Sequence, residues 1–259
     1  MHRFFVLDRG FCLSPEDAHH AMKVLRLGTG HLLVAVLPGG PEVLCRLEVT
    51  GGNPRLLPLE ERQPRSEPPV DVTLFQGLPK GDKMDLVVEK AAEIGVSRVV
   101  PVMTHRSVSR ADPRSSPRKV ERWRRIARGA AALSGRLIIP EVTEVMDWSG
   151  AMSLVESLPL VVMPWEAGAP GGLREALRDA PSSIGMFIGP EGGFEKQEVE
   201  EGMRKGLLPV SLGPRILRTE TAAIAALALI MGIAGDLGGP RDSWNTGWQS
   251  PETGESNNS

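Results

Sequence analysis

The sequence predicts an α/β protein in which a parallel sheet follows a smaller, β-rich amino-terminal unit. Short apolar segments alternate with helical patterns from residue 70 onward, which is typical of parallel strands whose two faces are covered by helices. Residues 1–66 instead hold short apolar segments separated by turn residues, with one predicted helix among them. A polar, proline-rich stretch, RQPRSEPP at residues 62–69, lies between the two patterns and is typical of a linker.

Composition limits the class of protein. A length of 259 residues suits one large or two ordinary domains, and we divide the chain into 1–66, 67–237 and a polar tail, 238–259, that we expect to be disordered. The net charge is −2, so any affinity for nucleic acid must be local. The chain shows no signal-peptide pattern and no apolar run long enough to span a bilayer, so we expect a cytoplasmic protein without a membrane partner.

We expect the amino-terminal unit to be a small β-barrel with one helix. Its strands are predicted in the apolar segments RFFVL, HLLVAVL, EVLCRLEV and PRLLPLE. The helix should follow Ser14 as N-cap, with Pro15 at its first position, and end near Leu25. We predict no metal site, because the adjacent His19 and His20 cannot chelate one ion as an i, i+4 pair would, and the two cysteines match no zinc or redox spacing.

The carboxyl-terminal unit is predicted to alternate strands and helices. Strands are expected at residues 70–75, 98–103, 138–142, 160–163, 184–188 and 208–212. Helices are expected at residues 83–94, 117–133, 173–178, 195–205 and 221–234, and Gly95 should close the first of them. The last helix is rich in alanine, and its pattern fits a core helix and a dimer interface equally well.

Three loops rich in glycine or proline follow predicted strands: VVMPWE at 161–166, FIGPEGGF at 187–194 and SLGPRILRTETA at 211–222. Because the carboxyl ends of neighbouring parallel strands meet at one edge, these loops could line one crevice. The chain has neither a P-loop nor a dinucleotide fingerprint, and Glu191 would repel a phosphate. The loops instead suit an adenine ring and backbone hydrogen bonds. The alternative interpretation is that Gly192 and Gly193 only form a tight turn.

Residues 104–128 form a local basic stretch in a nearly neutral protein, with nine Lys and Arg against two acidic residues. Such a cluster is typical of a nucleic-acid surface. Arg3, Lys23 and Arg26 of the amino-terminal unit are candidates to extend it. A solvated helix face would show the same pattern and is the alternative.

Several of these segments together resemble a known family. GPEGGF at 189–194 and LGPRILRTETA at 212–222 are the most specific of them, and RFFV at 3–6, HHAMKVLRLGTG at 19–30, KGDKMDLVVEKAAEIGV at 80–96 and RWRRIARGAAALSGR at 122–136 extend the likeness. The set resembles the bacterial 16S ribosomal RNA (uracil-N3)-methyltransferase family, in the SPOUT class of S-adenosylmethionine-dependent RNA methyltransferases. The resemblance implies a PUA-like β-barrel for RNA, a carboxyl-terminal trefoil knot whose loops hold S-adenosylmethionine, and a homodimer.

The resemblance also implies the reaction, a methyl transfer to N3 of a uridine in 16S ribosomal RNA of the small ribosomal subunit. Because N3 lies on the Watson–Crick edge, the base must be unpaired or flipped out. Arg218, with Arg136 second, is expected to steady the developing uridine anion, and no residue stands out as a general base. The residues expected to bind the cofactor are Met163, Pro164, Ile188, Gly189, Pro190, Glu191, Gly192, Gly193, Leu212, Gly213, Ile216, Leu217, Arg218 and Thr221. The residues expected to bind RNA are Arg3, Lys23, Arg26, Arg106, Arg122 and Arg125.

Two segments depart from the family pattern. Leu133 stands where glutamine usually precedes Ser-Gly-Arg, and Thr-His-Arg-Ser at 104–107 stands where Ser-Glu-Arg-Ser is usual. These departures leave the details of base recognition open.

A second class of function is a non-catalytic RNA-binding factor for ribosome assembly, with an idle cofactor fold. The intact GPEGGF and LGPRILRTETA segments argue against it, and saturable S-adenosylmethionine binding would discriminate between the two. A third reading, an enzyme of nucleotide phosphates, lacks the expected lysine.

Overall fold

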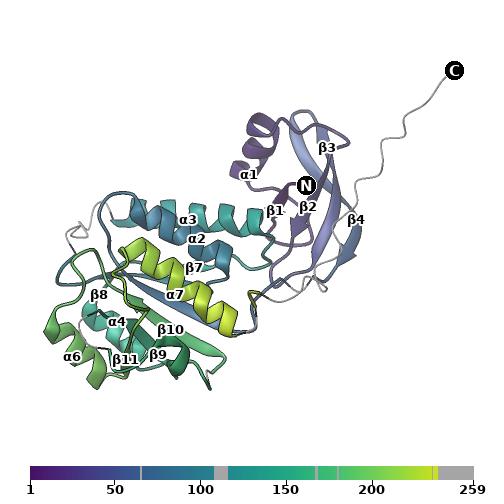
Figure 1. Ribbon diagram of the computed structural model, residues 1–259. Helices are drawn as coiled ribbons and strands as arrows, with labels where there is room; N and C mark the ends of the chain where they lie inside the picture. The colour runs from purple at the N-terminus through teal and green to yellow at the C-terminus, as the bar shows by residue number, and fades with distance from the viewer. Residues whose placement is uncertain (65, 108–115, 167–168, 180, 235, 239–259) are drawn as a thin grey trace. The chain divides into compact units, whose positions relative to one another are not determined.

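The computed structural model describes residues 1–64, 66–107, 116–166, 169–179, 181–234 and 236–238. Contacts along the chain define two compact units, Met1–Ser66 and Glu67–Gly239, and each is described by itself (Figure 1). Most of the predicted tail lies outside the described residues, as do Arg110 and Arg114 of the basic stretch.

The amino-terminal unit contains a four-stranded sheet. Its strands are β1 (Arg3–Phe5), β2 (Leu32–Val36), β3 (Glu42–Thr50) and β4 (Asn53–Arg62), and they lie in sequence order. β1 runs parallel to β2, while β3 is antiparallel to both β2 and β4. Among the described residues no strand pair closes this sheet into a ring, so the predicted barrel stays a prediction.

One helical segment completes the amino-terminal unit. Helix α1 (Pro15–His19) begins as predicted, because the side chain of Ser14 accepts a 3.0 Å hydrogen bond from the backbone N–H of Asp17. The chain continues into a π-helical turn (His20–Val24). The core includes alternate strand residues and one residue of this turn, and its fully buried members include Ala21, Leu33, Ala35, Cys45 and Leu47.

The carboxyl-terminal unit is built on a parallel sheet, as predicted. Its strand order is β11–β9–β10–β5–β6–β7, and β8 pairs beside the end of β6. All of the pairings in this sheet are parallel. The strands are β5 (Asp71–Gly77), β6 (Arg98–Met103), β7 (Glu141–Val142), β8 (Met146–Asp147), β9 (Val161–Pro164), β10 (Ser183–Ile188) and β11 (Leu207–Val210).

Three helices pack together on one face of this sheet. They are α2 (Lys83–Ile94), α3 (Ser116–Ser134) and α7 (Thr219–Ile233), and α2 lies between the other two (Figure 1). Leu74 of β5 belongs to the apolar cluster under these helices. Its neighbour Phe75 points to the opposite face, because successive strand residues alternate.

The opposite face is covered by α4 (Trp148–Val155) and α6 (Lys196–Arg204). Aromatic rings dominate the packing there. Phe75 stacks on Phe187 with ring centroids 5.2 Å apart, and Phe187 also contacts Phe194 at 5.6 Å. This cluster anchors both ends of the FIGPEGGF segment, because Phe187 and Phe194 are its first and last residues.

Element boundaries differ from the prediction in a few places. The strand expected at 138–142 is reduced to Glu141–Val142, since Pro140 has no N–H to donate to a ladder. The helix expected at 173–178 is a single turn, α5 (Leu173–Ala176), and α7 begins at Thr219, two residues earlier than predicted. In the described part of the chain no helix is long and apolar enough to cross a membrane, and no three metal-binding side chains cluster.

Candidate active site

A cavity of about 300 Å³ lies at the carboxyl edge of the parallel sheet. Its walls are formed by the ends of β9 and β10 with the loops that follow them, by the start of α7 with the segment before it, and by the first residue of α2. Its lining residues are Lys83, Pro164, Glu166, Ile188, Gly189, Pro190, Glu191, Gly193, Phe194, Ile216, Leu217, Arg218, Thr219 and Ala222.

Most of the residues predicted to bind a cofactor come together in this cavity. The nine that line it are Pro164, Ile188, Gly189, Pro190, Glu191, Gly193, Ile216, Leu217 and Arg218. The five that do not are Met163, Gly192, Leu212, Gly213 and Thr221. Met163 is fully buried beneath the site, whereas Gly213 and Thr221 are exposed. Thr221 is displaced from the cavity because the helix starts earlier and brings Thr219 to the wall instead.

The glycine loop after β10 is a tight turn that also forms a cavity wall. The backbone N–H of Gly193 donates a 2.9 Å hydrogen bond to the carbonyl of Pro190. Gly193 has a φ of +66°, which side-chain-bearing residues rarely adopt. A Cβ atom on Gly189 would lie only 3.1 Å from the ring of Phe194. The tight turn expected as an alternative is therefore present, and the cavity lies beside it.

Two residues that the sequence analysis missed hold this loop against β5. A Cβ atom on Gly77 would lie 2.7 Å from Cδ of Pro190, so only glycine lets the end of β5 pass so close. The fully buried Gln76 donates from Nε2 to Oγ1 of Thr219 at 3.0 Å. Thr219 in turn donates a 2.5 Å hydrogen bond to the carbonyl of Gly189. The strand end, the glycine loop and α7 are thus joined at one hydroxyl group.

Glu191 contacts the loop between β5 and α2. Its carboxylate accepts the backbone N–H of Lys80 at 3.2 Å and forms a 2.8 Å ion pair with Lys83. Desolvation alone would raise the pKa of Glu191, but the hydrogen bonds from Lys83 and from the backbone bring it below its ordinary value. Lys83 also lies 3.3 Å from Glu220 of α7, and its pKa is raised chiefly by the bond to Glu191. The negative charge of Glu191 is therefore already compensated.

Two charged residues at the cavity have no compensating partner among the described side chains. Arg218 directly precedes α7 with its side chain exposed. Glu166 follows β9, and its Oε1 would lie 3.4 Å from a Cβ atom placed on Gly193. The cavity therefore offers one cation and one anion to a ligand, beside apolar walls and glycine backbone.

Comparisons with known proteins agree with this geometry. A family model described as an RNA methyltransferase domain matches residues 66–231. The chain belongs to this RNA methyltransferase family. A Bacillus subtilis protein named Ribosomal RNA small subunit methyltransferase E is 32% identical over 85% of this chain and 89% of its own length. The namesake from Synechocystis is 31% identical over 87% of this chain and 74% of its own.

A solved structure gives the same result. The Ribosomal RNA small subunit methyltransferase E from Neisseria gonorrhoeae, whose structure is described as bound to S-adenosyl methionine, superposes with a TM-score of 0.77. It is 27% identical and covers 90% of this chain and 98% of its own. The resemblance in GPEGGF and LGPRILRTETA is thus confirmed at the level of this family.

Arg136 of this methyltransferase lies away from the cavity, so its expected role in steadying the uridine anion stays a prediction that its position does not support. The residue is 4% exposed and donates to the carbonyls of Ala92 and Val96, at 3.2 and 2.6 Å. It also pairs with Glu67 at 2.7 Å. Ala92 lies in the last turn of α2, Val96 follows that helix and Glu67 precedes β5. All three are at the amino edge of the sheet, whereas the cavity lies at the carboxyl edge. Arg136 is committed to fixing the fold.

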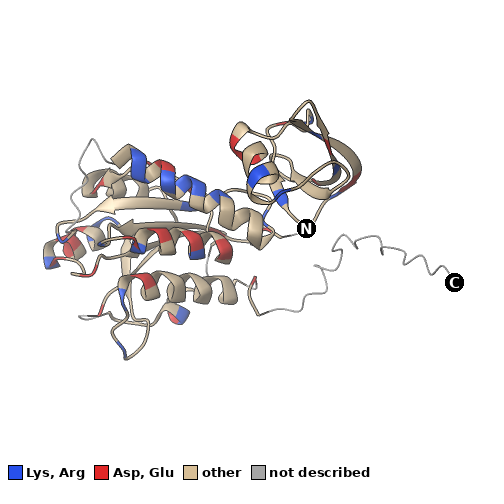
Figure 2. Ribbon diagram, turned by 90° about the horizontal axis from the view of Figure 1, so that it is seen from above, with Lys and Arg blue, Asp and Glu red and all other residues tan. Residues whose placement is uncertain are grey.

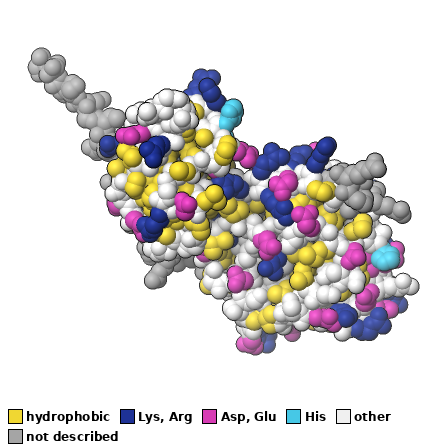
Figure 3. All heavy atoms as spheres, turned by 180° about the vertical axis from the view of Figure 1, so that it is seen from behind, with side chains coloured by type: hydrophobic (Ala, Val, Ile, Leu, Met, Phe, Trp, Pro, Cys, Tyr) yellow, Lys and Arg dark blue, Asp and Glu magenta, His cyan; other side chains and the backbone are white. Residues whose placement is uncertain are grey.

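The predicted RNA-binding residues of the methyltransferase domain differ in their availability. Lys and Arg gather along α3 (Figure 2), but Arg122 pairs with Asp85. Arg125 is exposed, and no partner for it is found among the described residues. Arg106 is half-exposed and donates to the carbonyl of Gly192 at 2.9 Å, so it contacts the glycine loop. On the face seen in Figure 3, acidic side chains lie among the basic ones, so basic character is local.

The residues of the amino-terminal unit that were predicted to bind RNA also differ in their exposure. Arg3 is largely buried and pairs with Glu42, which is 1% exposed and also bonds Arg62 at 2.7 Å. Desolvation, with a smaller effect of Arg62, lowers the pKa of Arg3 to about 10. An arginine held this way contributes to the stability of the unit, and the expectation that Arg3 contacts RNA stays a prediction. Lys23 and Arg26 are exposed, and Arg26 has a φ of +55°, unusual for a residue with a side chain.

Proposed function

We propose that this RNA methyltransferase uses S-adenosylmethionine to methylate N3 of a uridine in 16S ribosomal RNA. The observation that carries the proposal is the cavity formed by the glycine loop after β10 and the segment before α7. Relatives support the cofactor and the substrate, since two are named Ribosomal RNA small subunit methyltransferase E and the Neisseria structure is described as bound to S-adenosyl methionine.

The residues of the cavity fit this cofactor. Ile188, Phe194 and Leu217 offer apolar surface to an adenine ring, and the glycine loop offers close backbone approach. A volume of about 300 Å³ is within the range of small-molecule sites. Because Lys83 compensates Glu191, the carboxylate of Glu166 is the one available to a positively charged sulfonium. We assign cofactor binding to the nine predicted residues that line the cavity, with Glu166 and Thr219 added.

The chain's own part in catalysis is to orient two reactants, which can contribute roughly 7–11 kcal/mol. S-adenosylmethionine, when bound, supplies an electrophilic methyl group on its sulfonium. The uracil N3 must lose its proton to become a good nucleophile, and a cation beside the ring favours that loss. Arg218 is the cation at the mouth of the cavity, so we assign it the stabilisation of the uridine anion at O2 or O4. We assign no general base, and water can accept the proton.

We further propose that RNA is held by both units. Residues 1–66 act as a PUA-like RNA-binding domain with Lys23 and Arg26 as contacts, and residues 67–237 as a knotted SPOUT domain. In the second domain Arg125 and Arg106 meet RNA phosphates, because both are exposed at least in part. Alanine at Arg125 should weaken RNA binding and lower the log–log salt slope by about 0.7–0.9.

We propose that two copies of the chain associate through α7. The helix carries partly exposed Leu229 and Ile233 beside the small residues Ala228 and Gly232, and these border a broad groove shared with the segment around α5. Small residues let two backbones approach closely, and exposed apolar side chains favour burial in an interface. A Leu229→Glu variant that becomes monomeric in sedimentation would support this assignment.

Two measurements test the proposed function. Calorimetry should show saturable binding of S-adenosylmethionine to the purified chain, and RNA binding without cofactor binding would favour a non-catalytic assembly factor. The enzyme should then methylate 16S ribosomal RNA in subunits from a strain lacking it. Mass-spectrometric mapping that placed the new methyl group on a ribose, or on another base atom, would contradict N3 as the acceptor.

A further inference from the structure

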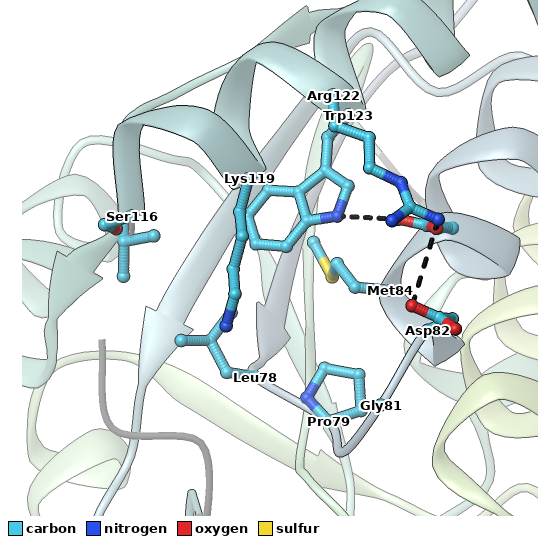
Figure 4. Close-up of a pocket in the computed structure, with 11 residues that line it drawn as sticks. Leu78, Pro79, Gly81, Asp82, Met84, Ser116, Lys119, Arg122 and Trp123 are labelled. Atoms are coloured by element: carbon cyan, nitrogen blue, oxygen red, sulfur yellow. Dashed lines mark hydrogen bonds and ion pairs between the residues drawn. The ribbon is translucent and has the colours of Figure 1, made fainter. Parts of the chain in front are cut away.

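A second, smaller cavity lies on the same domain and shares no lining residue with the cofactor cavity. It measures about 80 Å³ and lies between the start of α2 and the start of α3 (Figure 4). The two cavities border one segment of chain. Lys83 of that segment lines the cofactor cavity, whereas Asp82 and Met84 on either side of it line the smaller one.

The floor of the smaller cavity is apolar and rigid. Leu78, Met84 and Trp123 contribute to it and are 6%, 2% and 5% exposed. The indole Nε1 of Trp123 donates a 3.1 Å hydrogen bond to Asp85, and Arg122 pairs with the same carboxylate. The ring therefore cannot turn freely, and the small part of it that is exposed lines the cavity (Figure 4).

The rim of the cavity is polar and mixed in charge. Asp82 has a side chain that is 87% exposed and lies 3.8 Å from Arg122 of α3, and Lys119 of the same helix also lines the cavity. A phosphate would be repelled by Asp82, and Arg122 is already paired with Asp85. A nucleobase carries N–H donors and C=O acceptors on one edge and has apolar faces, so it complements both rim and floor. The small volume favours the single ring of a pyrimidine.

We propose that this cavity binds one unpaired pyrimidine base of the RNA, with its ring packed against Trp123. The inference rests on the proposed RNA-methylating function and extends it by naming where the chain recognises a base rather than a phosphate. Base recognition of this kind is available only in single-stranded RNA, where the Watson–Crick edge is open.

Two oligomers with the same phosphates separate base recognition from charge. Fluorescence anisotropy would compare hexauridylate with an abasic ribose-phosphate hexamer of equal length on the full chain. Packing of a base on an aromatic ring should make hexauridylate bind about 5- to 150-fold more tightly. Equal affinities would overturn the proposal. Binding of neither oligomer at low salt would overturn the RNA-binding function on which the proposal rests.

Variants at Ser116 localise the effect. Ser116 is the first residue of α3 and lines the cavity. Ser116→Trp should fill the space and reduce the affinity for hexauridylate to that for the abasic hexamer, while Ser116→Ala should keep it. S-adenosylmethionine affinity should be unchanged in both variants, because Ser116 does not line the cofactor cavity. A Ser116→Trp protein that is folded and still prefers hexauridylate would overturn the assignment.

A spectroscopic measurement on the unmodified protein is independent of those variants. The indole N–H signal of Trp123, assigned by its loss in Trp123→Phe, should shift on addition of hexauridylate and stay in place with the abasic hexamer. A Trp123 signal that does not move at saturating hexauridylate would place the bound base elsewhere and overturn the proposal.

Discussion

The hydroxyl of Thr219 and the carbonyl oxygen of Gly189 lie 2.5 Å apart, joined by a hydrogen bond between the first residue of the last helix and the glycine loop. Gln76 donates to the same hydroxyl from the middle of the sheet. One threonine side chain thus sets the position of two walls of the cavity relative to β5.

We expect Thr219→Val to damage both stability and cofactor affinity. It keeps the shape of the side chain but leaves the buried amide of Gln76 and the carbonyl of Gly189 with one partner fewer, which should cost about 1–3 kcal/mol in the free energy of unfolding. Urea unfolding and calorimetry with S-adenosylmethionine would measure the two effects. Thr219→Ser is the matched control, and its stability and cofactor affinity should be close to those of the parent protein. Equal stability of the valine variant would show that these bonds matter little.

Gly193→Val should weaken S-adenosylmethionine binding by about 5- to 150-fold, because a β-branched residue at a φ of +66° forces the turn out of shape. Gly206 provides a control, since it has a φ of +99° in an exposed turn and does not line the cavity. Gly206→Val should lower stability without changing cofactor affinity. Unaltered affinity in folded Gly193→Val would remove this loop from the cofactor site.

Glu166→Gln should distinguish the cofactor from its product. S-adenosylhomocysteine lacks the sulfonium charge, so only S-adenosylmethionine loses a Coulombic attraction. For an exposed carboxylate the loss is about 1 kcal/mol, or roughly fivefold in the dissociation constant. Calorimetry with both ligands would show it, and Glu200→Gln, on the exposed surface of α6, is the control. Equal weakening of both ligands would mean that Glu166 bonds a neutral group instead.

Arg136→Ala should unfold the protein more easily without altering the chemistry. Breaking a buried ion pair typically costs about 3–5 kcal/mol, and Glu67 and two backbone carbonyls would lose their donor. Urea unfolding should show this loss, while methylation per folded molecule should match the parent. Arg125→Ala, at an exposed position on the same helix, should change stability by less than about 0.5 kcal/mol. A folded Arg136→Ala protein with slow methylation would restore the catalytic assignment.

The ion pair between Glu191 and Lys83 should make stability depend on pH. The pKa of Glu191 is lowered in the folded state, so its contribution is complete above its ordinary value of 4.5 and is lost as pH falls through the lowered value. The pKa of Lys83 is raised, so its contribution is complete below 10.5 and is lost as pH rises through the raised value. The stability difference between the parent and Glu191→Gln should therefore be constant near neutral pH and shrink in acid. A difference that grew in acid would contradict the pairing.

The sequence predicted those parts of the cavity that lie within a single loop. A strand that runs into glycine and proline marks a ligand loop, and nine lining residues follow from three such segments. Gln76, Gly77 and Lys83 were missed because their partners lie more than a hundred positions away along the chain, as in the pair of Lys80 and Glu191, separated by 111. The position of Arg136 was not foreseen either, since Ser-Gly-Arg says nothing of Glu67, which lies 69 positions earlier in the predicted linker. The carboxyl-terminal trefoil knot stays a prediction.

The bond between Gln76 and Thr219 spans 143 positions, and its length along the chain has a consequence for synthesis. During translation, residues 71–188 can form the central strands before α7 exists, but the cavity cannot, because its last wall begins at residue 216. Closing so long a loop is entropically costly and comes late in folding. A nascent chain is therefore without a complete cofactor site until its carboxyl-terminal helix has left the ribosome that made it.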